Sequence, residues 1–400
     1  MKRFSYQAKD IRTKKIVKGT VQADNEKAAG RILVDQGYVP QKIKDADKQS
    51  FIQKFLNRVT TKDRVTFTRQ FATLIGAGLP LSASLRTVAE QTENKSMKLI
   101  VEEVLASVEG GKTLAESLAR YPEVFNHLYI SLVEAGETGG TLDESLRRLA
   151  DQQEKDASMI SKIRGAMVYP AIIFVVIIAV LAFMMILVVP QVDSLYSDMG
   201  EELPGLTKFL VAMSGFFAQF WWIILIMVAV LIWVFVQFRR TEIGIRWFAT
   251  AKLNMPLFKG MFQRLYMSRF TRTMQMLLAA GVSMLDAMTI AADATANVVV
   301  QKQIMEAAEQ VKGGKPLSES LEGRKYILDL VPQMASIGEQ SGKIDEMLGR
   351  AAKVFTDELD EQIANISTMI EPVLMVIMAA LIGIVIGGTL LPIYSLVSKI

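Results

Sequence analysis

The sequence predicts a mainly α-helical membrane protein that crosses the bilayer three times and carries two homologous cytoplasmic helical bundles behind a small N-terminal α/β module. Three observations lead to this fold class: three long apolar segments, an internal repeat with helical periodicity, and a short N-terminal region with strand-like alternation. Hydrophobic residues make up 51% of the chain, so part of the protein is expected to lie in lipid.

The first 48 residues are predicted to form the α/β module. The stretches "RFSYQAKD" and "IVKGTVQA" alternate like short strands, and "DNEKAAGRILVDQGYVPQKI" resembles a capped helix that ends at Gly37 and is followed by another strand. Residues 49–62 are expected to be a linker to the first bundle.

An internal repeat organises the rest of the chain. "FTRQFATLIGAGLPL" from Phe67 is echoed by "FTRTMQMLLAAGVSM" from Phe270, and "GETGGTLDESL" from Gly136 by "GEQSGKIDEML" from Gly338. Apolar residues recur with helical spacing in both copies, and glycines punctuate the runs at matching places. Each copy is therefore predicted to be an all-α bundle of about six helices whose last helix continues into the membrane.

Three apolar segments exceed the ~20 residues that a helix needs to cross ~30 Å of hydrocarbon. Proline stands near both ends of the first and third, and these prolines are expected to open the spans (Pro170, Pro372) and close them (Pro190, Pro392). The predicted parts are a first bundle at 63–165, span one at 166–189, a short loop at 190–215, span two at 216–238, a second bundle at 239–368, span three at 369–391 and a tail at 392–400.

The positive charges predict the orientation of these spans. Of 45 Lys and Arg, 27 precede span one and 16 lie between spans two and three. Because Lys and Arg beside a span are retained in the cytoplasm, both bundles and the N-terminus are expected there, with the loop and the C-terminus outside. The opening residues have no apolar core, so no cleavable signal peptide is expected.

The "VEGGKTLAESL" stretch raises the question of a nucleotide site. A phosphate-binding loop requires Gly-x4-Gly-Lys-[Ser/Thr] between a strand and a helix, but position 106 is Ala and the preceding residues have helical spacing. The second copy, "VKGGKPLSESL", has Pro316 where the hydroxyl is needed. The favoured interpretation is a helix–helix corner, with Thr113 and Glu116 as a capping box and Pro316 as a helix start. Lys112 and Lys315 are then exposed corner residues available to a partner.

Glu137 and Glu339 follow the glycine of the second repeated motif. Two interpretations compete: helix capping with dipole complementation, which is favoured, and presentation of both glutamates on a rigid loop to a partner protein.

In the third span, Glu371 precedes Pro372 at the cytoplasmic edge. It is interpreted either as a solvated boundary residue or as a polar contact to another membrane helix. Gly383 and Gly387 form a Gly-x3-Gly pattern that allows close helix packing within the protein, between protomers, or against a partner's apolar helix. No ionisable residue lies deep in a span, which argues against the alternative function of a polytopic transporter or channel component.

The composition favours no catalytic chemistry. The chain has no cysteine, and its single histidine, His127, lies in no cluster of carboxylates in the sequence, so we expect no metal site, no cofactor and no catalytic arrangement of Ser and His. His127 is interpreted as a surface or loop residue.

The sequence resembles the inner-membrane platform family of type IV pili and type II secretion systems, the F-protein family. The resemblance rests on the N-terminal module, the duplicated "LIGAGLPL" and "LLAAGVSM", the Gly-Gly-Lys corners and "PEVFNHLYISLVEAGETGGTLDESL". The resemblance covers nearly the whole chain. It implies a non-enzymatic assembly platform that couples a cytoplasmic hexameric ATPase to the insertion of pilin or pseudopilin helices into a fibre.

The partners implied by this resemblance are the ATPase, pilin or pseudopilin transmembrane helices, other inner-membrane assembly proteins and further copies of the chain, but no nucleic acid. The sequence leaves open whether the machine is a pilus, a competence pseudopilus or a secretion system. It also leaves open whether an extension motor, a retraction motor or both engage the protein, and whether the protomers form a dimer, trimer or tetramer.

Overall fold

The computed structural model describes residues 2–10, 16–23, 26–35, 37–45, 59–199, 204–256 and 258–397. These residues divide into two compact units, Met1–Lys112 and Thr113–Ile400. The boundary falls inside the segment 63–165 that the sequence predicts as one bundle. The later helices of that segment group with the second unit because α8 (Leu142–Phe183) contacts α17 (Ile344–Val397).

The N-terminal module is a three-stranded antiparallel sheet with strand order β2-β1-β3. β1 (Lys2–Asp10) pairs on one side with β2 (Ile16–Ala23) and on the other with β3 (Tyr38–Asp45), as the alternating pattern predicts. Helix α1 (Glu26–Asp35) contacts the sheet. Gly37, with φ of 83°, turns the chain from this helix into β3, as predicted. Most of the predicted linker, up to residue 58, lies outside the described residues.

Both copies of the repeat contain the predicted six helices, in the same order. The matching left-handed glycines explain why: Gly78, Gly111 and Gly140 follow helix ends in copy one, as Gly281, Gly314 and Gly342 do in copy two. Copy one has α3 (Thr61–Gly76), α4 (Leu81–Gln91), α5 (Lys95–Glu109), α6 (Leu114–Ala119), α7 (His127–Gly139) and α8; copy two has α12 (Lys259–Ala279), α13 (Met284–Ala294), α14 (Val298–Lys312), α15 (Leu317–Leu321), α16 (Leu330–Ser341) and α17.

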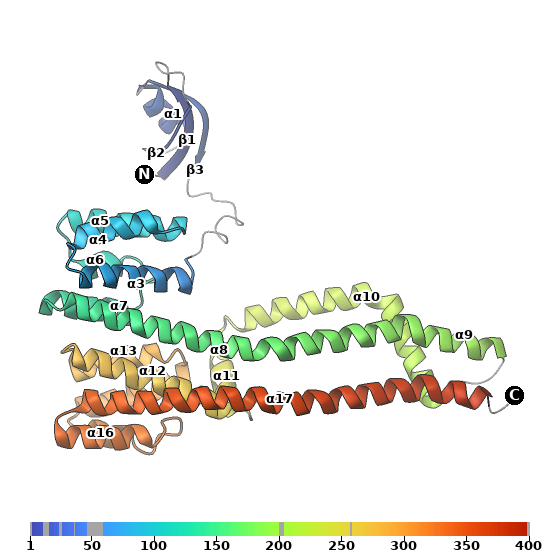
Figure 1. The fold of residues 1–400 in the computed structure, drawn as a ribbon. Helices are drawn as coiled ribbons and strands as arrows, with labels where there is room; N and C mark the ends of the chain where they lie inside the picture. Colours follow the sequence, from blue (N-terminus) through green and yellow to red (C-terminus); the bar gives the residue numbers. More distant parts are fainter. Residues whose placement is uncertain are drawn as a thin grey trace. The chain divides into compact units, whose positions relative to one another are not determined.

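The last helix of each copy continues without a break into an apolar segment, as predicted. Over the described residues, three helical stretches are long and apolar enough to cross a membrane, namely Leu142–Asp198, Gln219–Phe238 and Ile344–Gly388. Figure 1 shows α8 and α17 as the two longest rods of the second unit. The second stretch, Gln219–Phe238, belongs to α10 (Gly205–Phe238), which is kinked at Phe220. A helix α11 (Glu242–Asn254) follows it.

The helix of the first span does not end at Pro190. The helix passes through it by way of a π-helical turn, Met184–Val188, and continues as α9 (Val189–Met199). Pro392 likewise lies inside α17. The segment 190–215, predicted as a loop, is therefore helical in α9 and again from the start of α10.

Two hydroxyl groups on α10 compensate for the missing N–H groups of these prolines. In a π turn, residue 190 would donate to the carbonyl of Met185, and in an α-helix residue 392 would donate to the carbonyl of Gly388. Proline cannot donate. Ser214 donates its hydroxyl to the Met185 oxygen, and Thr207 donates to the Gly388 oxygen over 3.0 Å. The start of α10 is thereby bonded to both repeat helices, and the side chains of Thr207 and Ser214 are buried at these contacts.

The hydrogen bond of Thr207 should depend on the proline that makes it necessary. We expect Thr207→Val to lower the free energy of unfolding by about 1 kcal/mol, the scale of such contacts in membranes. In a Pro392→Ala background, residue 392 supplies its own N–H to Gly388, so the same substitution should cost close to nothing.

This double-mutant cycle is measured by thermal unfolding of the full chain in detergent. Thr368→Val is the matched control, because the Thr368 hydroxyl bonds only to Ala364 of its own helix. An equal cost of Thr207→Val in both backgrounds would contradict the compensation.

Candidate functional site

The Gly-Gly-Lys corner ends α5 in copy one and α14 in copy two with the same backbone geometry. Gly111 and Gly314 have φ of 88° and 92°, a left-handed conformation that favours glycine. The following lysines donate their backbone N–H back into the helix: Lys112 to Ser107 and Lys315 to Gln310, both over 3.1 Å. Both lysines are exposed. The predicted corner is confirmed.

The backbone donors around each corner are already bonded, so they do not surround a phosphate. In copy one, Gly110 donates to Ala106 and Gly111 donates to Val108. The next helix begins at Thr113, whose hydroxyl accepts from the Glu116 N–H over 3.1 Å, which confirms half of the predicted capping box. In copy two, Pro316 is the N-cap of α15, as a helix start requires.

The carboxylates of Glu137 and Glu339 cap the helices that begin after these corners. Glu137 accepts from the backbone N–H groups of Leu114 over 2.8 Å and Ala115 over 3.1 Å. A negative group is favourable there, because the first N–H groups of a helix have no partner within the helix.

Copy two repeats this contact with one addition. Glu339 accepts from the N–H of Leu317 and from the hydroxyl of Ser318. Both glutamates are half-buried and lie on the last turn of α7 or α16. Each one thus caps the first turn of a helix that begins about twenty residues earlier in the chain.

Both glutamates act as helix caps, as the favoured interpretation has it, and the alternative of a loop position is wrong, because α7 and α16 continue past them. Gly140 and Gly342, with φ of 69° and 70°, end the two helices in the left-handed conformation. The preceding glycine of each motif has a different role. A Cβ on Gly136 would lie 2.5 Å from Ser145 Oγ, and one on Gly338 would lie 2.6 Å from the Cα of Ile344. These glycines allow the next long helix to pack directly against the capping helix.

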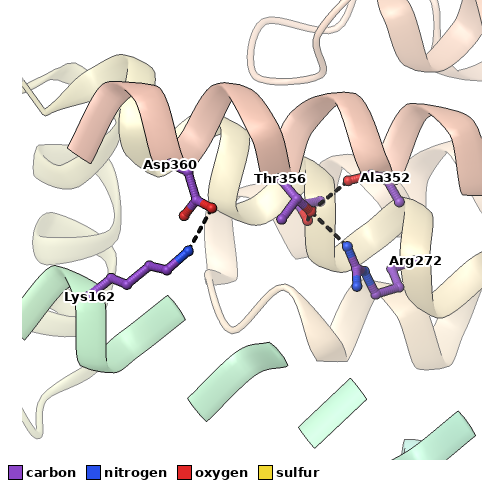
Figure 2. Close-up of polar contacts among 6 residues, drawn as sticks. Lys162, Arg272, Ala352, Thr356 and Asp360 are labelled. Atoms are coloured by element: carbon purple, nitrogen blue, oxygen red, sulfur yellow. Dashed lines mark hydrogen bonds and ion pairs between the residues drawn. The ribbon is translucent and has the colours of Figure 1, made fainter. Parts of the chain in front are cut away.

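A set of polar contacts, called the polar seam here, joins α8, α12 and α17 in the second unit. Its residues on α8 and α17 precede the apolar segments of these helices in the sequence. Lys162 of α8 forms an ion pair with Asp360 of α17 over 2.6 Å. Figure 2 shows this pair beside Thr356, whose hydroxyl donates to the Ala352 carbonyl and accepts from the Arg272 guanidinium over 2.7 Å. The last helices of both copies are thus in direct polar contact.

Arg272 is the most enclosed cation of this seam. Burial lowers the pKa of its guanidinium, while the negative charges of Asp156 on α8 and Asp357 on α17 raise it. An arginine remains charged through such opposing effects, since its ordinary pKa lies far above neutrality. The α12 helix therefore places a fixed positive charge between carboxylates on the two long helices.

The predicted membrane residues are mostly exposed. Glu371 is exposed on α17, and nothing lies within 4 Å of a Cβ built on Gly383. Gly387 is half-buried, and the buried Gly388 beside it is the residue that accepts from Thr207. The Gly383 surface of α17 therefore packs against no other described part of this chain. His127, the first residue of α7, is exposed as predicted.

Comparison with known proteins gives the same repeat. The family model for type II secretion system (T2SS) protein F matches residues 67–190 and again 270–392, and the model for the N-terminal domain of that protein matches residues 1–44. This chain belongs to the type II secretion system protein F family. The two matched segments begin at Phe67 and Phe270, the start of the internal repeat.

Curated relatives in this family cover nearly the whole chain. The type IV pilus assembly protein PilC of Thermus thermophilus is 33% identical over 99% of this chain and 98% of its own length. PilC of Myxococcus xanthus is 34% identical over 96% and 92%. The type II secretion system protein F of Vibrio cholerae is 34% identical over 99% and 98%. Relatives from pilus and secretion machines are thus equally similar.

Sequence reasoning located the corners of this F-family protein but missed the seam. The seam residues lie on three helices far apart in the sequence, and no local motif marks them. The role of the glutamates in capping these corners could have been inferred from the repeat. Glu137 and Glu339 occupy the same position in both copies although most residues around them differ.

Proposed function

We propose that this chain is the inner-membrane assembly platform of a type IV pilus or a type II secretion-like machine. It couples a cytoplasmic hexameric ATPase to the insertion of pilin or pseudopilin subunits into a fibre. Membership of the protein F family supports the assembly role, and the apolar helices support a multi-pass location in the membrane. The cytoplasmic N-terminus and external C-terminus follow from the distribution of Lys and Arg.

The observation that carries this proposal is the continuity of α8 and α17. These helices have 42 and 54 residues, so at 1.5 Å per residue they extend about 60 Å and 80 Å. Each follows a left-handed glycine, Gly140 or Gly342, and ends in an apolar stretch. A displacement imposed on the helical domains by an ATPase is therefore transmitted along a rigid element into the bilayer, where pilin helices reside.

The seam sets how the two rods move. Because Lys162 pairs with Asp360 and Arg272 lies between carboxylates of both helices, the rods are joined near their entry into the membrane. The exposed pair itself contributes little stability. Its role in this proposal is to keep the two spans in a fixed register while the domains respond to the motor.

Different surfaces serve the two classes of partner in this proposal. The exposed Lys112 and Lys315, on corners braced by Glu137 and Glu339, contact the ATPase or associated cytoplasmic proteins. The exposed Glu371, with Gly383 and Gly387, contacts pilin helices, other inner-membrane assembly proteins or a second protomer, because α17 leaves that surface uncovered.

The proposal is tested by recovering the full chain from its native membranes and identifying what co-purifies. We expect one hexameric ATPase and one pilin or pseudopilin. Recovery of neither, together with uptake of solutes by liposomes that contain the protein, would favour a transporter instead. ATP hydrolysis by the purified chain that is lost in Lys112→Ala would also contradict the platform role.

The corner lysines give a sharper test of the ATPase contact. We expect Lys112→Glu combined with Lys315→Glu to reduce ATPase recovery about tenfold, since reversed charges turn attraction into repulsion at an interface. Because both side chains are exposed, the thermal stability of the chain should stay within about 0.5 kcal/mol.

The control for this reversal is Lys353→Glu combined with Lys95→Glu, which alters two exposed lysines away from the corners. An equal loss of ATPase with the control pair would mean that overall charge, rather than the corners, governs binding. Undiminished recovery with the corner pair would remove the lysines from the interface.

A further inference from the structure

Helix α11 begins immediately after an apolar stretch that is long enough to cross the membrane. α10 ends at Phe238 and α11 starts at Glu242, so three residues connect them, which reach at most about 10 Å. The turn is also tight. A Cβ on Gly244 would overlap the Phe238 carbonyl oxygen, so only glycine allows the first turn of α11 to pack against the end of α10. The start of α11 therefore remains at the membrane surface.

An aromatic cluster fixes the angle between these two helices. Phe248 packs edge-on against Phe235, with ring centroids 5.3 Å apart, and against Trp247 at 5.0 Å. The Arg239 guanidinium lies over the rings of Phe235 and Phe248, 5.9 Å and 5.7 Å from their centroids. The elbow between span and helix is thus a packed element rather than a loose connection.

One side of α11 packs on the second helical domain. Ala249 and Leu253 are buried, and the side-chain amide of Asn297 donates to the Ala249 carbonyl over 3.1 Å. Leu253 is fully enclosed. Burial of these apolar side chains stabilises α11, and the hydrogen bond to Asn297 fixes its position on the second helical domain.

The opposite side of α11 is apolar, cationic and uncovered by the described part of the chain. Ile243 is 75% exposed, the largest value among the large hydrophobic side chains, and Trp247, one turn later, is 58% exposed. Arg239 and Arg240, just before the helix, and Arg246, at its edge toward α14, are exposed and form no ion pair with a described carboxylate.

A groove between α11 and the neighbouring α14 is lined by a basic residue from each helix. Arg246 and Lys302 line one groove between α11 and α14, of about 630 Å³, together with the apolar side chains of Ile245, Val298 and Val299. The groove also holds two carboxylates, Glu242 and Glu306, and Glu306 pairs with Lys302 over 3.9 Å and with Arg324 over 3.2 Å. The groove therefore combines apolar surface with the Arg246 guanidinium, which forms no ion pair with a described carboxylate.

We propose that α11 is an in-plane interfacial helix that docks on anionic phospholipid headgroups. Ile243 and Trp247 enter the boundary between headgroups and acyl chains, and Arg239, Arg240 and Arg246 bind lipid phosphates. Three observations identify the occupant: the short tether to a membrane stretch, tryptophan beside exposed aliphatic surface, and exposed cations at the start of the helix and along one edge of it. An acidic protein partner would match the arginines but would not account for apolar side chains held at membrane depth.

This docking has a consequence for the platform. Because α11 packs on α12 and α14 and its other side is held by lipid, the second helical domain is anchored to the bilayer directly as well as through α17. In copy one, the only described helix before α3 is α1, which belongs to the N-terminal module. The inference does not depend on which motor or fibre the protein serves.

The four tryptophans of the chain make a direct test possible. A variant with Trp221, Trp222 and Trp233 replaced by phenylalanine leaves Trp247 as the sole fluorophore. In nanodiscs of phosphatidylcholine with phosphatidylglycerol, we expect lipids brominated close to the glycerol backbone to quench Trp247 and aqueous acrylamide to quench it weakly. Strong acrylamide quenching without quenching by the bromolipids would overturn the proposal and leave the surface to a protein partner.

The arginines are tested by the lipid that stays bound during limited detergent extraction. The ratio of phosphatidylglycerol to phosphatidylcholine should fall about fivefold for each of Arg239, Arg240 and Arg246 replaced by glutamine, the scale of one basic residue at an anionic surface. Lys312, Lys315 and Lys343 replaced by glutamine are the charge-matched control, which should leave the ratio unchanged.

Equal ratios in the two triple variants would overturn the anionic-lipid assignment, whatever the quenching result. Arg246→Gln alone keeps the aromatic elbow, because the stacked cation is Arg239, so it separates lipid binding from folding. Neither measurement involves the ATPase or pilins. Failure of this inference and failure of the proposed function are therefore distinguishable.

Discussion

Gly338→Ala is expected to lower the free energy of unfolding by about 2–3 kcal/mol, although alanine is normally the better helix former. Gly338 lies inside α16, and a Cβ there would meet the Cα of Ile344 at 2.6 Å and its backbone nitrogen at 3.2 Å. Backbone atoms cannot rotate away as a side chain does. Because Ile344 is the first residue of α17, the whole rod must shift.

Gly136→Ala is the same change in copy one, and it should be partly reversible. There the new Cβ meets the side chain of Ser145, 2.5 Å from Oγ and 2.8 Å from Cβ. Ser145→Gly removes both atoms, so the double variant should be less destabilised than the sum of the two single variants. Additive costs would show that the clash is not with Ser145.

Gly165→Ala is the control for both substitutions, because nothing lies within 4 Å of a Cβ at that helical position. It should leave stability unchanged or raise it by up to about 1 kcal/mol. All variants are compared as full-length protein by thermal unfolding in one detergent. A Gly338→Ala variant as stable as the control would contradict the packing account.

These glycines illustrate what the sequence predicts and what it does not. The corners and the number of helices per copy can be predicted from the glycines, because a glycine in the left-handed conformation ends a helix without help from other elements. The role of Gly136 is different. It lies within α7, and it is required because α8 packs closely against it. The sequence alone suggests that a helix ends at this glycine, which placed Glu137 in a turn instead of in the helix.

The spans show the same limit. Length and hydropathy predicted the apolar segments, because those properties are local to each segment. The passage of the helix through Pro190 was not predicted, since it requires a π turn and a hydroxyl donated from Ser214 on another helix. Likewise, the exposed side of α11 could not be predicted from the sequence, because it is defined by the packing that buries Ala249 and Leu253 on the other side.

Removal of a capping carboxylate is the second substitution with a large expected effect. We expect Glu339→Ala to lower the free energy of unfolding by about 2 kcal/mol, because it leaves backbone donors at the start of α15 without their charged acceptor. Leu317, which donates one of them, is buried, so water reaches that N–H poorly. Glu137→Ala should have a similar effect on α6, where Leu114 and Ala115 are also buried.

The functional consequence distinguishes bracing from direct contact with a partner. If Glu339 acts only by fixing its corner, Glu339→Gln should restore most of the stability, since an amide oxygen still accepts one of the hydrogen bonds, and ATPase recovery should return with it. Glu319→Ala is the control, because Glu319 is an exposed glutamate on the same short helix. If Glu339→Gln is as stable as the unchanged chain but still fails to recover the ATPase, the carboxylate itself contacts the partner. Co-purification from membranes at matched protein levels, alongside thermal unfolding, separates the two outcomes.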